Sequence, residues 1–147
     1  TGPCGTGKTY LACALGHSAC MQGYSVRYYR LSRLLLELTQ AKADGTYHKK
    51  LQQIAKIQLL IIDDWGMETL NAAQRNDVME IMDDRYGATS TLVISQLPTD
   101  QWYATIGDNT LADAILDRLM HNAHRLLLKG ESMRNKMADL TQDEHLR

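Results

Sequence analysis

The first ten residues carry the clearest chemical signal of the chain, a glycine-rich loop that ends in lysine and threonine. Residues 2–9 read GPCGTGKT and match the pattern GxxxxGK[S/T] at every fixed position. Glycines there let successive backbone N–H groups turn inward around phosphate oxygens, where a side chain would obstruct them. Lys8 can reach the β- and γ-phosphates of a nucleotide, and the hydroxyl of Thr9 can ligand Mg²⁺. The full match disfavours a chance glycine loop and predicts nucleotide contacts from Gly2, Pro3, Cys4, Gly5, Thr6, Gly7, Lys8, Thr9 and Tyr10.

Two carboxylates after a short apolar run predict a second part of the same site. Residues 58–62 read QLLII and are followed by Asp63 and Asp64. Such a run is typical of a strand covered on both faces of a parallel sheet, and ligands bind at the carboxyl ends of these strands. We expect Asp63 to hold Mg²⁺, directly or through water, and Asp64 to polarise the attacking water. The alternative, in which the two acids only cap the turn to Trp65 and Gly66, is weaker beside a complete phosphate loop.

Apolar patterns along the chain predict the elements that position these residues. Helical spacing predicts helices over 8–22, 32–44, a stretch around 51–55, 71–86, 102–106 and 110–119, with Ser32 and Thr110 opening the second and last of them. Runs rich in aliphatic and aromatic residues predict strands over 24–31, 58–63, 90–95 and 123–128. Because strands and helices alternate, the expected fold class is α/β with a mostly parallel sheet flanked by helices.

The composition suits one domain and excludes several functional classes. The chain has 147 residues, of which 44% are hydrophobic, and a domain usually has roughly 100–200 residues. Sixteen Lys and Arg against 17 Asp and Glu give a formal charge of −1, which argues against a polybasic or an acidic tail. Three cysteines without a CxxC pair disfavour a disulfide scaffold or a zinc ribbon and favour a cytoplasmic location. Without an apolar run of about 18 residues, no membrane partner is expected.

Four segments resemble the IstB family, the ATP-binding helper proteins of insertion-sequence transposition. They are residues 2–16 (GPCGTGKTYLACALG), 59–66 (LLIIDDWG), 91–98 (TLVISQLP) and 107–134. IstB proteins belong to the AAA+ ATPases and are close relatives of the DnaC helicase loader. The resemblance, which extends over nearly the whole chain, implies a P-loop NTPase fold of the AAA+ type that binds ATP, ADP and Mg²⁺. It also implies a homo-oligomer on duplex DNA, with little sequence preference, that hands a transposase to its target.

The resemblance implies roles for single residues at the phosphates. Lys8, Thr9 and Asp63 fall on the positions that bind ATP and magnesium in the family. Asp64 stands where many AAA+ proteins have glutamate, and its shorter side chain implies slow hydrolysis that a partner stimulates. Ser95 and Gln96 fall on the first sensor position, where a polar side chain contacts the γ-phosphate or the water. The pattern leaves open which of the two does so, and we favour Gln96.

Two arginines extend the implied site. Arg118, within the sequence LDRL, matches the box that supplies an arginine finger to a neighbouring subunit, where a guanidinium stabilises charge on the γ-phosphate. The alternative is a surface pairing of Arg118 with Asp113 or Asp117, which contributes little energy. Arg134 is a weaker candidate for the second sensor, because the lid that normally presents it is absent or cut short.

Basic residues near the second predicted strand are candidates for DNA contact. Arg27, Arg30 and Arg33 cluster there, and residues 48–50 read HKK. Binding of DNA phosphates needs such charge, and an oligomer could align modest patches into one groove. A solvated face accounts equally well for any single one of these residues. Other conspicuous side chains are expected to pack: Cys13 and Cys20 in the core, and Trp65 and Trp102 in the core or an interface.

The motifs divide the chain near residue 130. We expect an AAA+ core over 1–130 and a polar tail or lid remnant over 131–147. In AAA+ topology the strand that feeds the phosphate loop lies at the centre of the sheet, and here it would have to precede Thr1. Without it, neighbouring strands would keep unpaired backbone groups beside a gap in the core. We therefore expect a fragment or the C-terminal part of a longer protein, which binds ATP poorly by itself.

The preferred function is that of a transposition helper ATPase, and three alternatives remain. The first is a DnaC-like helicase loader, with the same site chemistry and a different protein partner. The second is a nucleotide-dependent DNA-binding scaffold without meaningful turnover, and the third is a small-molecule phosphotransferase. Residues 95–98 (SQLP) and 130–134 favour the transposition branch over the loader, and the sequence has no basic lid for a phosphate acceptor.

Overall fold

Three parallel strands form the sheet of this computed structural model, which describes residues 1–133. They are β1 (Val26–Arg30), β2 (Leu59–Asp63) and β3 (Ser90–Val93), hydrogen-bonded in the order β1-β2-β3. The register places Tyr28 opposite Ile61 and Ile61 opposite Leu92. The α/β class with a parallel sheet is confirmed, and these three strands begin and end within two residues of the predicted bounds.

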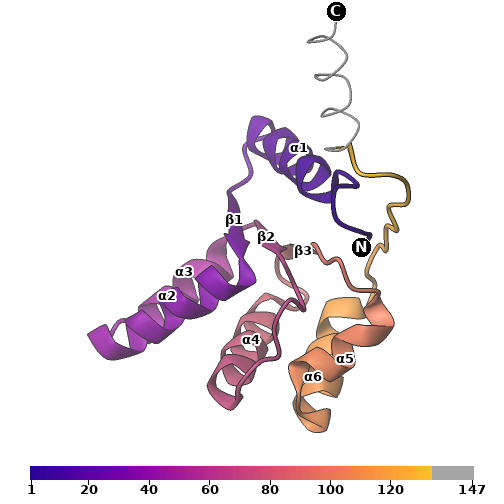
Figure 1. Cartoon of the computed structure of the whole chain (residues 1–147). Coiled ribbons are helices and arrows are strands. Elements are labelled where there is room, and N and C mark those ends of the chain that lie inside the picture. The colour runs from indigo at the N-terminus through magenta and orange to yellow at the C-terminus, as the bar shows by residue number, and fades with distance from the viewer. Residues whose placement is uncertain (134–147) are drawn as a thin grey trace, which may run out of the picture.

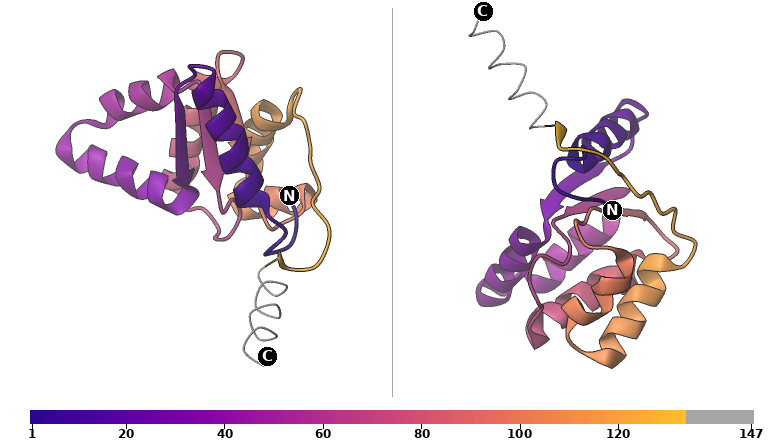
Figure 2. Two further views of the ribbon diagram at one scale, coloured as in Figure 1. Left: turned by 90° about the horizontal axis from the view of Figure 1, so that it is seen from above. Right: turned by 45° about the vertical axis from the view of Figure 1, so that its right-hand side comes forward.

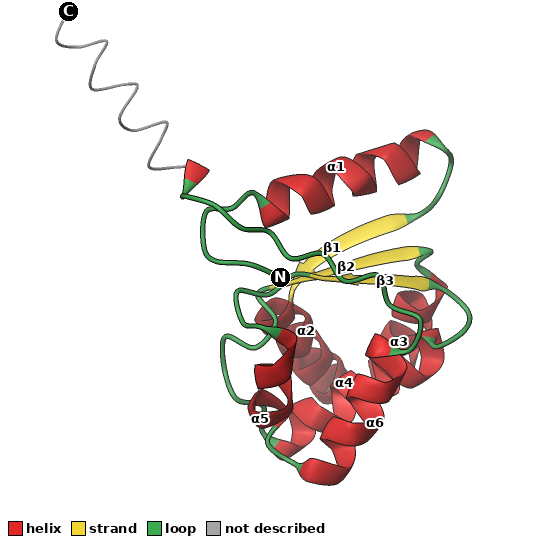
Figure 3. Cartoon of the chain, turned by 90° about the vertical axis from the view of Figure 1, so that its right-hand side faces the viewer, coloured by secondary structure: helices red, strands yellow, loops and turns green. Residues whose placement is uncertain are grey.

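Helices cover the two faces of the sheet unequally. Within the described residues, α1 (Lys8–Met21) alone covers one face of the sheet, and the other helices pack on the opposite face (Figures 1 and 3). Those helices are α2 (Leu31–Asp44), α3 (Tyr47–Lys56), α4 (Ala72–Arg85), the 3-10 helix η1 (Thr99–Gln101), α5 (Trp102–Ile106) and α6 (Asn109–Met120). Within residues 1–133, no helix combines the length and the apolar composition that crossing a membrane requires.

The main core lies between the sheet and the layer formed by α2 to α6. Leu60 and Ile62 of β2 are fully buried in it, whereas Ile61 packs under α1. β2 is therefore buried on both faces, which explains its continuous apolar run. Trp65 and Trp102 are also buried, with ring centroids 5.6 Å apart, so the prediction that they pack is confirmed.

The prediction that Cys13 and Cys20 lie in the core is wrong, because both are exposed. α1 meets the sheet through the small residues Ala12 and Gly16. A Cβ atom at Gly16 would lie 3.0 Å from the Cδ1 atom of Ile61, so the helix axis sits too close to the sheet for a larger residue at this contact. The cysteines point away from that narrow contact and into solvent.

Two predicted helix starts are displaced by one or two residues. α2 begins at Leu31, directly after β1, so Ser32 lies in its first turn and does not cap it. α6 begins at Asn109, where the side chain of Asp108 accepts a hydrogen bond of 2.8 Å from the backbone N–H of Leu111. A carboxylate at this position also meets the positive end of the helix dipole. Thr110 consequently lies inside the helix.

The predicted strand over residues 123–128 is absent from the structure. Backbone hydrogen bonds join Thr1 to Leu126 and Leu128 of this extended segment. Figure 2 shows the N-terminus beside the segment. A strand needs a partner along its length, and here a cavity of about 990 Å³ separates the segment from β3. The segment therefore does not pair with β3.

Candidate nucleotide and magnesium site

The phosphate loop leads directly into the N-terminus of α1. Gly7 caps the helix with φ +84°, a left-handed conformation that glycine adopts without strain. No side chain of the described residues caps this first turn, and the turn contains no acidic residue. The backbone N–H groups and the positive end of the helix dipole are therefore suited to an anion. This arrangement is what the sequence motif predicts.

Lys8 folds back over the loop. Its ammonium donates a hydrogen bond of 2.5 Å to the carbonyl oxygen of Pro3, which also accepts one of 2.9 Å from the hydroxyl of Thr6. The ammonium of Lys8 thus lies next to the phosphate loop, where the phosphates of a nucleotide would compete with the carbonyl oxygen of Pro3 for it. Tyr10, two residues further along α1, is 83% exposed.

Residues that follow position 128 return to the loop. The backbone N–H of Met133 donates a hydrogen bond of 2.8 Å to the carbonyl oxygen of Gly5. A Cβ atom at Gly5 would lie 2.2 Å from the hydroxyl oxygen of Ser132, so only glycine permits this contact. Arg134, the candidate second sensor, lies outside the described residues.

The predicted magnesium ligands lie together although 54 positions separate them in the chain. The hydroxyl of Thr9, on α1, donates a hydrogen bond of 2.9 Å to Oδ2 of Asp63, at the carboxyl end of β2. Asp63 is buried, and its Oδ1 accepts a hydrogen bond of 2.7 Å from the backbone N–H of Asp64. One hydroxyl and one carboxylate suit Mg²⁺, which is held by few protein ligands together with water and phosphate oxygens. The residues present therefore fit this ion.

Tyr28 is a member of the site that sequence reasoning missed. Its hydroxyl donates a hydrogen bond of 2.5 Å to Oδ2 of Asp63, the oxygen that also contacts Thr9. Burial, and then the hydrogen bond to Asp63, raise the pKa of Tyr28 to about 12. The register of the parallel pair, which the structure sets, places Arg30 opposite Asp63 and Tyr28 on the same face two residues earlier.

Asp64 adopts a left-handed backbone conformation, with φ +58°. Its carboxylate faces Arg30, with 3.6 Å between Oδ2 and Nε; the side chain of Arg30 is largely exposed to solvent and that of Asp64 partly exposed. Such a pair contributes little stability. Arg30, predicted as a DNA contact, therefore lies at the rim of the nucleotide site.

The two candidate sensor residues have different environments. Ser95 is 1% exposed, and its hydroxyl donates to the carbonyl oxygen of Trp65 (2.6 Å) while accepting from the N–H of Leu97 (3.1 Å). Ser95 thus links the segment that follows β3 to the turn that follows β2. Gln96 is exposed. The side chain that remains available for a phosphate or a water is that of Gln96.

Arg118 pairs with a residue that the sequence analysis did not consider. Its Nε lies 2.5 Å from Oδ1 of Asp83 on α4, and its guanidinium also donates to the carbonyl oxygen of Ala114. Neither Asp113 nor Asp117 is the partner, because α6 packs on α4 and brings Asp83 within reach. Within its own chain the guanidinium of Arg118 is thus bound by α4, and its predicted action in a neighbouring subunit stays a proposal.

Of the candidate DNA contacts, Lys50 already has a partner. Its ammonium lies 2.8 Å from Oε2 of Glu37. Arg27, Arg33 and Lys49 are exposed. These three side chains are therefore accessible to a partner such as DNA phosphates.

A glycine loop that opens a helix, with a carboxylate from the adjacent parallel strand at its end, defines a P-loop nucleotide-binding protein. Its parallel sheet and flanking helices are shared with the solved structures described below, which shows the fold. The chain belongs to the family of IstB-like ATP-binding proteins, whose family model matches residues 1–141.

Relatives carry names that agree with this family. An insertion-sequence ATP-binding protein of Sinorhizobium fredii is 54% identical over 133 residues, which are 90% of this chain and 54% of the relative. Another, from Pseudomonas aeruginosa, is 38% identical over 135 residues, 92% of this chain and 51% of the relative. The chain thus spans about half the length of the curated relatives it matches.

Solved structures share the fold at low sequence identity. DnaI matches with a TM-score of 0.76 and 23% identity over 87% of this chain and 70% of its own. AMPPCP-bound DnaA from Aquifex aeolicus matches with a TM-score of 0.74 and 19% identity over 97% of this chain and 43% of its own. These likenesses show the fold, which is the AAA+ type that the sequence predicts.

Proposed function

We propose that this chain supplies the ATP and Mg²⁺ site of a helper of DNA transposition, which hydrolyses ATP slowly, assembles on duplex DNA and recruits a transposase. The observation that most directly supports a working ATP site is the hydrogen bond of 2.9 Å between Thr9 and Asp63. It joins the two halves of the site, the phosphate loop and the end of β2. The insertion-sequence names of the relatives support transposition as the setting.

In this proposal the loop N–H groups and Lys8 hold the phosphates, and Thr9 and Asp63 would hold Mg²⁺. When bound, the ion neutralises charge on the β- and γ-phosphate oxygens. Asp64 orients the attacking water, and Gln96 contacts the γ-phosphate or that water. Because the side chain of Asp64 is one methylene shorter than that of glutamate, we expect slow turnover that a partner accelerates.

Oligomerisation would complete the site. We propose that Arg118 exchanges its partner Asp83 for the γ-phosphate bound by a neighbouring subunit. The exchange is inexpensive, because an ion pair whose carboxylate is 54% exposed contributes only about 0–1 kcal/mol. Repetition of the accessible residues Arg27, Arg33 and Lys49 around a homo-oligomer would supply the positive charge for duplex DNA. A cytoplasmic location remains a prediction.

Phosphate release, measured with and without duplex DNA, tests the enzymatic part of the proposal. We expect slow release that DNA increases and that Asp64→Asn abolishes while ATP binding persists. Asp113→Asn, an exposed acid on α6, is the matched control and should leave the rate unchanged. ATP binding without release under either condition would contradict hydrolysis and favour the scaffold alternative.

A helicase loader is the second candidate, and the likeness to the solved structure of the DnaC helicase loader, with a TM-score of 0.72 and 22% identity, favours it among the alternatives. The two functions share the ATP site and differ in the protein that is bound. Co-purification with a transposase, dependent on ATP and lost in Lys8→Ala, would support the transposition helper. Binding of a replicative helicase without binding of a transposase would support the loader.

A further inference from the structure

The outer side of α1 is exposed and carries no formal charge. Residues 9–26 include no Asp, Glu, Lys or Arg. α1 packs on β1 and β2, and no other helix of the described chain lies on its side of the sheet (Figure 3). A helix that only faces water usually carries charges on that face, as α4 does with the exposed acids Glu80, Asp83 and Asp84. An exposed face without charges is typical of an interaction site.

Five exposed residues form one stripe along this side. They follow one another at intervals of three, four, three and four residues, the spacing at which side chains of one helix pack against a second helix. We call this stripe the α1 seam, and its members are Tyr10, Cys13, His17, Cys20 and Tyr24. Tyr24 follows the helix, and its backbone N–H donates a hydrogen bond of 3.0 Å to the carbonyl oxygen of Ala19, which holds it at the last turn. Tyr10 is 83% exposed and Tyr24 is 51% exposed.

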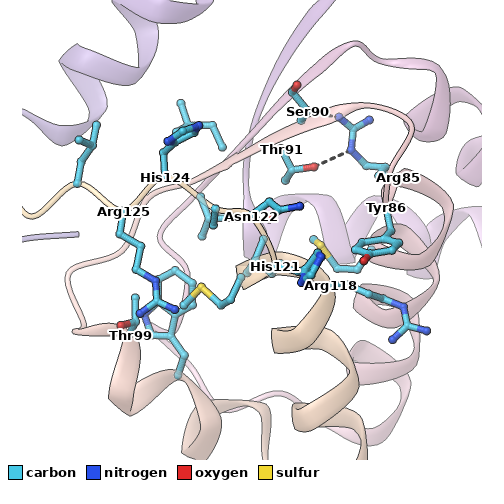
Figure 4. Close-up of a pocket in the computed structure, with 18 of the residues that line it drawn as sticks. Arg85, Tyr86, Ser90, Thr91, Thr99, Arg118, His121, Asn122, His124 and Arg125 are labelled. Carbon is cyan, nitrogen blue, oxygen red and sulfur yellow. Dashed lines mark hydrogen bonds between the residues drawn. The ribbon is translucent and has the colours of Figure 1, made fainter.

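The cavity beside β3, whose lining Figure 4 shows, does not include the α1 seam. The residue of α1 that lines this cavity is Leu15. Leu15 precedes His17 by two residues and therefore lies about 160° from it around the helix. The seam and the cavity are thus on opposite sides of α1, and the seam is a separate surface.

The α1 seam reads the same in both directions. Tyrosine stands at both ends, cysteine at both inner positions and histidine at the centre. When two copies of one helix pack antiparallel about a twofold axis at this centre, each residue meets the one at the mirrored position. Tyr10 then meets Tyr24 of the second copy, Cys13 meets Cys20, and His17 meets its own counterpart. The order of the seam is therefore self-complementary, which is the property that a twofold contact requires.

The lack of charge also favours a second copy of this chain over other occupants. Identical charged faces repel each other, and these faces have no formal charge. A helix that lies on a membrane surface carries lysine and arginine on its polar side, whereas residues 9–26 contain neither. An unrelated protein partner would not require a mirrored order of residues.

We propose that the α1 seam is an interface between two copies of this chain, whose α1 helices pack antiparallel about a twofold axis near His17. This contact goes beyond the proposed function. It is also distinct from the contact of Arg118 with a neighbouring subunit, because α1 and α6 lie on opposite faces of the sheet (Figure 3). The pairing places Cys13 beside Cys20 of the second copy. The two copies of Cys13, by contrast, lie seven residues apart along the helix axis, which is ~10.5 Å.

Disulfide cross-linking of the whole chain, without nucleotide, tests the contact and its direction. Cys4→Ser first leaves Cys13 and Cys20 as the thiols of the chain. With a mild oxidant such as diamide, we expect a covalent dimer whose disulfides, located by mass spectrometry, join Cys13 to Cys20. A disulfide needs Cα atoms within ~7 Å of each other, so one chain cannot link its own two thiols across ~10.5 Å of helix.

Single-cysteine variants give the matched controls. Adding Cys13→Ser or Cys20→Ser leaves one thiol, whose two copies are ~10.5 Å apart along the axis. Each of these variants should therefore form at least about tenfold less covalent dimer than the chain with both thiols. A dimer that forms as readily through Cys13 alone would show a parallel or unspecific contact, and no dimer with both thiols would show no contact. Either result would overturn the proposal.

Sedimentation of the reduced chain measures the contact without oxidation. The mass should rise from that of one chain towards that of two as the concentration increases. His17→Glu, which brings two carboxylates together on the axis, should raise the dissociation constant at least about tenfold. Ser18→Glu is the matched control, because Ser18 is also exposed and a charge there lies about 100° further around the helix. Equal effects of the two variants would contradict the proposal. The mass of one chain at every concentration would overturn it in favour of a different protein partner.

Discussion

Replacing Arg85 with methionine is expected to remove a large part of the stability of the fold. Arg85 lies on α4 and is 2% exposed. Its guanidinium reaches the end of α3 through the carbonyl oxygens of Ile54 (2.8 Å) and Ile57 (2.7 Å). It reaches the start of β3 through the carbonyl oxygen of Ser90 and the hydroxyl of Thr91. One side chain thus holds three elements together.

The magnitude follows from the acceptors that methionine would leave behind. A buried acceptor left without a donor costs ~1–3 kcal/mol, which applies in full to the carbonyl oxygen of Ile57. The carbonyl oxygen of Ile54 keeps the N–H of Ile57 as a donor (3.3 Å), and that of Ser90 keeps its partner in the ladder with β2, so each of these two loses only a hydrogen bond of about 0.5–1.5 kcal/mol. The sum is about 2–6 kcal/mol. Two effects move the result to the low end. Water can enter from the adjacent cavity, and burial lowers the pKa of Arg85 to about 10, which shows that the charge, although retained at pH 7, is unfavourably placed. We expect a loss of about 3 kcal/mol, against a typical stability of about 5–15 kcal/mol.

Urea unfolding, followed by the fluorescence of the buried pair Trp65 and Trp102, measures this loss. Arg33→Met is the matched control, because Arg33 is exposed on α2 and should change stability by less than about 0.5 kcal/mol. Arg85→Lys should fall between the two, since its ammonium cannot reach every acceptor. If Arg85→Met lies within about 1 kcal/mol of the wild type, the carbonyl oxygens do not depend on this guanidinium and the reasoning is refuted.

Four further predictions concern the site and α6. Tyr28→Phe should raise the Mg²⁺ concentration needed for half-maximal nucleotide binding about threefold, because the carboxylate of Asp63 loses one of its donors; an unchanged or lower value would contradict this. Asp63→Asn should weaken the Mg²⁺ dependence while keeping part of the nucleotide affinity, and an identical metal titration would refute its role. Mixing Arg118→Ala with Lys8→Ala subunits should restore some phosphate release, and no recovery at any ratio would count against action in trans. Asp108→Ala should lower the free energy of unfolding by about 1 kcal/mol through loss of the α6 cap, with no change in urea midpoint as the opposing result.

Much of the phosphate site could be predicted because its geometry is local. The loop is a run of consecutive residues whose backbone N–H groups bind phosphate, so the spacing of glycines and lysine already describes it. Asp63 ends an apolar run, and strand ends meet at one edge of a parallel sheet. The structure places Thr9 beside it as expected.

The predictions that failed depend on neighbours far away in the chain. Residues 123–128 have the composition of a strand, yet a strand also needs a backbone partner, and β3 lies across a cavity. Cys13 and Cys20 have the spacing of core residues, but the close approach of α1 to Ile61 admits only small side chains on the facing side. In both cases the residue types suited the predicted element or the core, but packing against distant parts of the chain decided whether a strand formed and which side chains were buried.

By itself, the sequence determined the family, the α/β class and the positions of the phosphate loop and its carboxylate, because these depend on residue types at short fixed spacing. Only the tertiary structure decided which distant side chains meet. It brought Tyr28 to Asp63, gave Arg118 the partner Asp83, and left the hydroxyl of Ser95 bonded to the backbone around it. The physical reason is that such contacts depend on strand register and helix packing, which the whole chain sets together and which no short segment encodes.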